Sequence, residues 1–209
     1  KVYDKKQDTI WKEKNVLAVQ DKKEIIAIGE DAYQMYEKTP PDIEVAFPMR
    51  DGVISRFNDM QNLLQNILKK NRHFSRGAEY VIAVPTDVTE VQKKAFFDLV
   101  IHSNAKAREV NIVERSIADA VGLGIDVQNT TGVMIINFGG ETTELSVLTE
   151  GGIVFNRLLK LGGTTLDQEI VNLVRNSHDF LIGSRTAEIL RQQFDVFNGD
   201  SETAFSVAG

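Results

Sequence analysis

The chain has 209 residues, of which 42% are hydrophobic and 26% are charged, a composition typical of a folded globular protein and not of a disordered one. The formal net charge of −6 provides no basic field for nucleic acid, so we expect no nucleic-acid partner. The lack of cysteine excludes a disulfide framework, a thiolate zinc site and a cysteine nucleophile. No apolar run approaches the roughly 20 residues of a membrane-spanning helix, and we expect a soluble, cytoplasmic protein.

The first third of the chain alternates short β-rich runs with charged turns, which predicts a meander of strands interrupted by a short helix. Asp51-Gly52 is a turn signal, and apolar residues then recur at helical spacing from Phe57 to Leu68. The predicted strands are residues 9–11, 15–20, 24–28 and 45–48, the last at a sheet edge, and the short helix is 30–36.

The middle of the chain predicts strand, helix, strand and helix in succession. Tyr80–Val84 is a continuous apolar run of strand length, which is typical of a buried strand in a parallel or mixed sheet. Thr89 and Gln92 have the spacing of a capping box at the start of a helix. A short strand at 110–113 and a small-residue helix at 116–123 follow.

The pattern restarts after a boundary near residues 126–131, so we expect a second α/β half. Strands are predicted at 133–138, 142–148 and 153–161, and helices at about 165–175 and 184–193.

Two glycine pairs in this second half are candidate anion sites. Gly139-Gly140 is a turn between two strands, where backbone N–H groups and the hydroxyls of Thr142 and Thr143 could surround a phosphate. An ordinary hairpin with a glycine turn is the alternative. Gly162-Gly163 precedes a helix, whose N-terminus could bind an anion, or it is a strand-to-helix connection that needs positive φ. Neither pair matches a Walker A or dinucleotide motif.

Several stretches in the same order resemble the MreB family of bacterial actins, within the superfamily of actin, sugar kinases and DnaK-type chaperones. The segment from Asn137 to Glu144 is similar to the family's phosphate-binding hairpin, DIGGGTTE. Further similar stretches, which together cover nearly the whole chain, are residues 29–32, 51–54, 84–91, 151–154 and 181–188.

The resemblance implies an α/β actin-like ATPase fold of the ribonuclease H type, with two halves around a nucleotide cleft. It divides the chain into residues 1–126, with a small inserted subdomain at about 10–50, and residues 127–209. It also places the family's first phosphate loop before Lys1 and its second adenosine loop after Gly209. We therefore expect a fragment that lacks its N-terminal strand and whose second half is incomplete.

The resemblance also implies which residues bind ATP or ADP with Mg²⁺. Gly140, Glu141 and Thr142 correspond to residues at the β- and γ-phosphates, and Gly162 and Gly163 to residues near the ribose and phosphates. Glu188 and Arg191 would lie beside the adenosine, although an ordinary ion pair between them on the helix surface is the alternative. The full predicted set is Asn137, Gly139, Gly140, Glu141, Thr142, Thr143, Gly162, Gly163, Glu188 and Arg191.

Three departures from the family pattern concern hydrolysis. Asn137 replaces the aspartate that helps to hold magnesium through water, so the charge that attracts a hard cation is lost. Glu141 replaces the third glycine, which places a carboxylate close to the expected phosphates, where it could repel them or supply the charge toward the metal that Asn137 lacks. The family's water-orienting glutamate falls on Arg115, with Glu114 one position earlier, and arginine cannot act as a base. We therefore expect Glu114 and Arg115 to support at most slow ATP hydrolysis.

A basic loop is similar in position to the family's membrane-touching loop. Around one phenylalanine it carries basic side chains that an anionic membrane would attract, although a solvated charged loop is the alternative. The residues concerned are Lys70, Arg72, Phe74 and Arg76.

The resemblance implies cytoplasmic, membrane-associated filaments of copies of this protein that direct cell shape and wall synthesis together with membrane proteins. A non-polymerising actin-fold adaptor with weak or no nucleotide turnover is the alternative, and a sugar or small-molecule kinase is a third.

Overall fold

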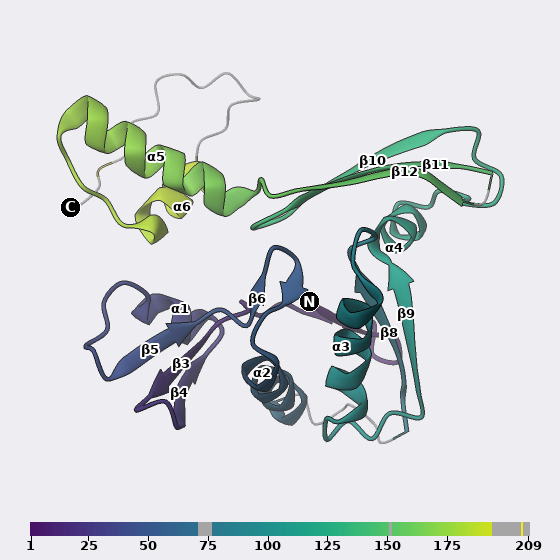
Figure 1. Cartoon of the computed structure of the whole chain (residues 1–209), viewed down its shortest axis with the longest axis horizontal. Helices are drawn as coiled ribbons and strands as arrows, with labels where there is room; N and C mark the ends of the chain where they lie inside the picture. The colour runs from purple at the N-terminus through teal and green to yellow at the C-terminus, as the bar shows by residue number, and fades with distance from the viewer. Residues whose placement is uncertain (71–76, 151, 194–205, 207–209) are drawn as a thin grey trace. The chain divides into compact units, whose positions relative to one another are not determined.

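The computed structural model describes residues 1–70, 77–150, 152–193 and 206 (Figure 1). The chain divides into two compact units, which we call the N-terminal unit, Lys1–Ile125, and the C-terminal unit, Asp126–Gly209. Each unit is described by itself.

The N-terminal unit begins with two small sheets. Strands β1 (Val2–Asp4) and β2 (Thr9–Trp11) form an antiparallel hairpin. Strand β3 (Leu17–Gln20) then lies between β4 (Glu24–Ile28) and β5 (Ile43–Ala46), antiparallel to both. The edge strand predicted at residues 45–48 is confirmed as β5, although its bounds are Ile43–Ala46.

Strand β3 is buried on both faces because a helix packs on each. Leu17 clusters with Leu63 of α2 (Phe57–Lys70), whereas Ala18 clusters with Ala32 of α1 (Glu30–Met35). Leu17 and Ala18 are both 0% exposed, as alternate side chains of a central strand should be between two covering layers. The helices therefore complete the core of this subdomain (Figure 1).

A tight hairpin connects β5 to α2 along the chain. Strands β6 (Met49–Arg50) and β7 (Val53–Ile54) pair through a two-residue loop, Asp51-Gly52, whose φ angles are 51° and 81°. Two positive φ values are the signature of a type I′ turn, so the predicted turn is confirmed.

The rest of the N-terminal unit is a strand–helix–strand–helix segment. Strands β8 (Glu79–Val84) and β9 (Glu109–Glu114) pair in parallel, joined by α3 (Glu90–Ile101), and α4 (Arg115–Gly122) follows. The capping box is confirmed: the Thr89 hydroxyl accepts from the Gln92 backbone N–H, and Gln92 Oε1 accepts from the Thr89 N–H.

The expectation of a fully buried strand at Tyr80–Val84 is wrong. Val84 is 0% exposed but Val81 is 69% exposed, so the strand alternates between a covered and an open face. Within the described residues β8 and β9 form a two-stranded sheet, and the two helices that contact β8, α3 and α4, leave this open face uncovered.

The C-terminal unit starts with a three-stranded meander and continues with two helices. Strands β10 (Val133–Phe138), β11 (Thr143–Thr149) and β12 (Gly152–Leu159) are antiparallel in chain order. Helices α5 (Gly163–His178) and α6 (Ser184–Gln193) pack against each other (Figure 1). Their shared core consists of Val171, Ile182, Ala187 and Leu190.

No helix in the described part of the chain combines the length and the apolar character needed to cross a membrane.

Candidate nucleotide-binding site

The turn between β10 and β11 is fixed to the first turn of α5 by its carbonyl groups. The N–H of Gly163 donates to the Gly139 oxygen at 3.0 Å, and the N–H and hydroxyl of Thr164 both donate to the Gly140 oxygen, at 2.7 and 2.9 Å. The Thr143 hydroxyl adds a 2.6 Å bond to the Leu161 carbonyl. The structure thus brings the two predicted glycine pairs together, and the leading N–H groups of α5 bind the hairpin.

The Gly162-Gly163 pair is needed for close approach and not for backbone conformation. A Cβ on Gly162 would lie 2.6 Å from the Gly140 oxygen and 2.8 Å from the Glu141 carbonyl carbon, closer than real Cβ contacts allow. None of Gly139, Gly140, Gly162 and Gly163 is among the described residues with positive φ. The alternative that the second pair needs positive φ is therefore wrong.

Gly140 differs from its neighbours because nothing lies within 4 Å of where its Cβ would be. Its carbonyl is held by Thr164, yet the space beside its Cα is open. The packing of the fold therefore gives no reason for a glycine at this position.

Arg191 reaches the first residue of α5 from α6. A Cβ on Gly163 would lie 3.0 Å from Arg191 Nη2 and 3.3 Å from its Cζ, so the guanidinium rests against the glycine backbone. Arg191 Nε donates to Asp167 Oδ1 at 2.6 Å and Nη2 to Oδ2 at 3.3 Å. Glu188 accepts a 3.2 Å hydrogen bond from Gln192 on the same helix. The sequence reasoning missed Asp167, which only the packing of α5 on α6 brings to Arg191.

Asn137 has a neighbour that the sequence reasoning also missed. Asn137 of β10 is the register partner of Glu144 of β11, so both side chains lie on the same face of the sheet. Glu144 is 2% exposed, and its Oε1 accepts a 2.9 Å hydrogen bond from Asn156 Nδ2, which also donates to Ser146 Oγ at 2.8 Å. Alternation along β11 could have revealed that Glu144 shares a face with Asn137.

Glu114 and Arg115 lie where β9 ends and α4 begins. Glu114 is the last residue of β9, in register with Val84 of β8, and it precedes α4 without a capping bond from its side chain. Thr86, after β8, lies 2.9 Å from Ser116 in the first turn of α4, hydroxyl oxygen to hydroxyl oxygen. Glu114 and Arg115 therefore lie at the carboxyl edge of the parallel strands β8 and β9, and ligands of α/β sheets bind at this edge.

The predicted membrane loop is described only in part. Arg72, Phe74 and Arg76 lie outside the described residues. Lys70 ends α2, and its Nζ lies 3.9 Å from Glu13 Oε2, with 57% of its side chain exposed.

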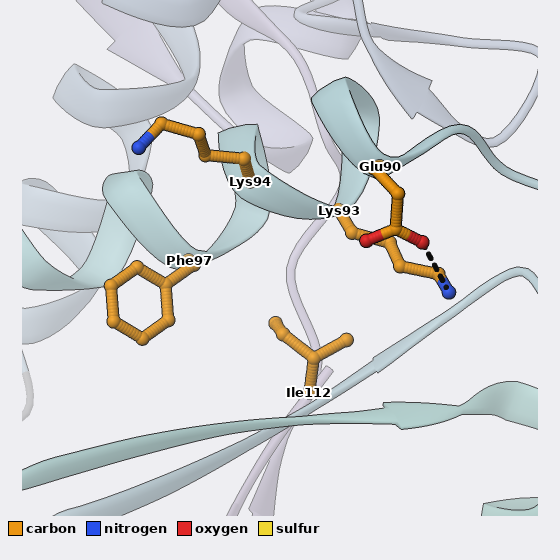
Figure 2. Close-up of a pocket in the computed structure, with 5 residues that line it drawn as sticks. All are labelled: Glu90, Lys93, Lys94, Phe97 and Ile112. Atoms are coloured by element: carbon orange, nitrogen blue, oxygen red, sulfur yellow. Dashed lines mark ion pairs between the residues drawn. The ribbon is translucent and has the colours of Figure 1, made fainter.

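A shallow pocket of about 320 Å³ lies on the N-terminal unit, between α3 and β9. Figure 2 shows Phe97 and Ile112 facing each other across it, with the Glu90–Lys93 ion pair on one side. None of its lining residues belongs to the set predicted from the sequence. These residues are Glu90, Lys93, Lys94, Phe97 and Ile112.

The described residues hold no cluster of three or more acidic, histidine or cysteine side chains that could bind a metal. Magnesium usually retains several waters and binds through one or two carboxylates together with substrate phosphates. The neighbouring Asn137 and Glu144 fit a metal that arrives with a nucleotide, and they do not form a protein cage for one.

The chain matches a known protein family along its whole length. The model of the MreB/Mbl protein family matches residues 1–209. The cell shape-determining protein MreB of Escherichia coli K12 is 34% identical over 217 aligned residues, covering 100% of this chain and 62% of the relative. The cell shape-determining protein Mbl of Bacillus cereus is 30% identical and is covered to 63%. The chain thus spans under two thirds of the length of these relatives.

Solved structures give the same result for the fold. MreB5 of Spiroplasma citri bound to AMPPNP superposes with a TM-score of 0.84 at 31% identity, covering 91% of this chain and 58% of that one. Its ADP-bound form gives a TM-score of 0.81. The MamK double helical filament matches with a TM-score of 0.71 at 18% identity, a likeness of fold alone. The α/β actin-like fold predicted from the sequence is confirmed, and the chain belongs to the MreB/Mbl family.

Proposed function

We propose that this protein is an MreB-like actin homologue that binds ATP or ADP and assembles into cytoplasmic filaments at the membrane, where it directs cell shape and wall synthesis. One observation carries the nucleotide-binding part: the turn at Gly140 is anchored through its carbonyl, while the space beside its Cα is open. A fixed turn with an open glycine lets a phosphate approach the backbone closely. The nucleotide-bound structures of the relative MreB5 support the same proposal.

In this proposal the hairpin residues Gly139 to Thr143 belong to the nucleotide site, with Gly140, Glu141 and Thr142 at the β- and γ-phosphates. Gly162 and Gly163 lie near the ribose and phosphates, and Glu188 and Arg191 lie beside the adenosine. Asn137 and Glu144 would hold the magnesium ion that accompanies the nucleotide. When bound, that ion neutralises phosphate charge. Glu141 lies near the same phosphates, where its carboxylate either repels them or supplies the charge toward the metal that Asn137 lacks.

Binding is tested by replacing Gly140 with leucine in the full-length protein. The substitution is expected to abolish ADP binding without unfolding the protein, because no atom lies within 4 Å of the Cβ position. Gly122→Leu is the matched control, since Gly122 in α4 is equally open and lacks positive φ. Equal ADP affinity of both variants and the wild type would contradict the phosphate role of the hairpin.

Assembly is tested by electron microscopy of the full-length protein on anionic liposomes with ATP, with ADP and without nucleotide. Filaments that depend on nucleotide are expected. A folded protein that stays dispersed in all three conditions would overturn the filament proposal and favour the adaptor. Asn137, Glu141 and Arg115 are the observation behind that second candidate, because they differ from the family's catalytic pattern.

Slow hydrolysis follows from Arg115 at the position of the water-orienting glutamate. Arg115→Glu is expected to raise phosphate release from ATP by at least about tenfold, since a positioned carboxylate acting on the water contributes about 10²–10⁴-fold. Arg50→Glu, which makes the same change of charge at an exposed position of β6, is the control and is expected to leave the rate unchanged.

A further inference from the structure

The ion pair between Asp167 of α5 and Arg191 of α6 is partly buried and has two hydrogen bonds. Asp167 is 6% exposed, and the Arg191 side chain is 28% exposed. The fork of Nε and Nη2 on the two carboxylate oxygens fixes the plane of the guanidinium, which a single contact would not do.

The guanidinium is fixed beside Gly163, the first residue of α5, which is bonded to the turn between β10 and β11. The three guanidinium atoms nearest Gly163 lie 3.0 to 3.6 Å from where its Cβ would be, and the Gly163 N–H is bonded to the Gly139 carbonyl. Asp167 thus places Arg191 against Gly163, the residue whose N–H bonds to the hairpin turn, although Asp167 and Arg191 are 24 positions apart in the sequence.

We infer that Asp167 is a positioning residue that also neutralises Arg191, so that the guanidinium recognises the uncharged nucleoside part of a bound nucleotide by directed hydrogen bonds. This inference rests on the proposed nucleotide binding. An unpaired guanidinium beside the turn would attract phosphates over several ångströms from any direction. A carboxylate in contact cancels most of that field and leaves short-range, directional donors, which suit ribose hydroxyls.

The inference predicts a dependence on salt that a purely structural role would not produce. In Asp167→Asn the orientation of Arg191 is lost, but its charge is unmasked near the phosphates. At low salt the attraction between the unmasked Arg191 charge and the phosphates compensates in part for the lost orientation. At high salt this attraction is screened, so the loss of affinity is larger. The variant is therefore expected to bind ADP about tenfold more weakly than the wild type in 0.5 M salt, with a clearly smaller ratio in 0.05 M salt.

The experiment measures the ADP dissociation constant of the full-length protein by calorimetry at both salt concentrations, with folding checked by circular dichroism. Glu169→Gln is the matched control, because it makes the same change of charge at an exposed position of α5. Its affinity ratio to the wild type is expected to stay near one at both salt concentrations.

The double variant Asp167→Asn/Arg191→Gln retains an amide pair and unmasks no charge, so it keeps the test open if Asp167→Asn fails to fold. It is expected to lose about tenfold in ADP affinity equally at both salt concentrations. Wild-type affinity of this double variant, or a salt-independent ratio for a folded Asp167→Asn, would overturn the inference alone. If the wild type itself fails to bind ADP, both the inference and the proposed nucleotide binding are overturned.

Discussion

The carbonyl oxygen of Gly140 lies 2.6 Å from the position that a Cβ on Gly162 would occupy. At this point the backbone of the hairpin turn and the backbone before α5 are in direct contact, with no side chain between Gly140 and Gly162. Because backbone atoms lie on both sides of this contact, neither side can easily move to admit a Cβ at residue 162.

Gly162→Ala is expected to separate the turn from α5 and to cost about 2–3 kcal/mol, in the range of overpacking substitutions. Gly163→Ala is expected to cost about 1 kcal/mol, because its Cβ would lie 3.0 Å from Arg191 Nη2, and the end of a side chain can shift by a few tenths of an ångström more easily than backbone can. Hydrogen exchange of the Gly163 and Thr164 amides measures the difference, since both donate to the hairpin. Similar exchange rates in the two variants would contradict this account.

Thr89→Ala is expected to destabilise the N-terminal unit by about 1 kcal/mol, because it removes the side-chain half of the capping box at α3. Thr89→Ser retains the hydroxyl and is expected to retain most of the stability. Chemical denaturation of the three proteins measures the effect, and an alanine variant as stable as the serine variant would show that the cap contributes nothing.

Tyr80 provides a test at alkaline pH. Burial raises the pKa of its hydroxyl, with a contribution from the negative charge of Asp4, and the hydroxyl makes no hydrogen bond with any described residue. Because the folded-state pKa lies above the unfolded value of about 10, the unfolded state ionises first as pH rises. The stability associated with the neutral hydroxyl is thus present below pH ~10 and falls above it.

Tyr80→Phe is therefore expected to lose less stability than the wild type between pH 8 and pH 10.5. At pH 8 it should match the wild type or exceed it by up to about 1 kcal/mol, since it removes an unsatisfied hydroxyl. The denaturant midpoints of the wild type and of Tyr80→Phe, measured at both pH values, test this expectation. An equal loss of stability in the two proteins would refute the burial of the Tyr80 hydroxyl.

Asn156→Asp is expected to destabilise the β10–β11–β12 sheet, because it places a second carboxylate against the buried Glu144, where an amide now donates at 2.9 Å. Protonation of one carboxylate relieves the repulsion, so this variant should be more stable at pH 5 than at pH 7. Asn156→Ala, which adds no charge, is the control. A melting temperature of the aspartate variant that is the same at both pH values would count against the contact.

The sequence predicts the order of strands and helices well because local patterns decide them: the Thr89 capping box, the Asp51-Gly52 turn and the apolar spacing of α2 all form as expected. It fails where a residue's role depends on distant packing. Val81 is exposed because no second layer covers its face of β8, and an apolar run alone does not reveal that.

The same limit applies to the candidate site. The resemblance identifies Gly162, Gly163 and Arg191, but the reason for each glycine is a contact across 20 residues or more of sequence. Asp167 looks like an ordinary polar residue of α5 until α6 folds back against it. Glu144 could have been inferred, because strand alternation and the β10–β11 hairpin together place it beside Asn137.

The meander of β10, β11 and β12 has a consequence for how the protein folds as it is made. Each of its strands pairs with the next in sequence, so the loops closed are short, and such local contacts form quickly. Synthesis proceeds at only about 5–20 residues per second, so this sheet can pair while α5 and α6 are still being made. The emerging helix α5 then meets a hairpin turn that is already formed, and its first N–H groups dock onto existing carbonyls.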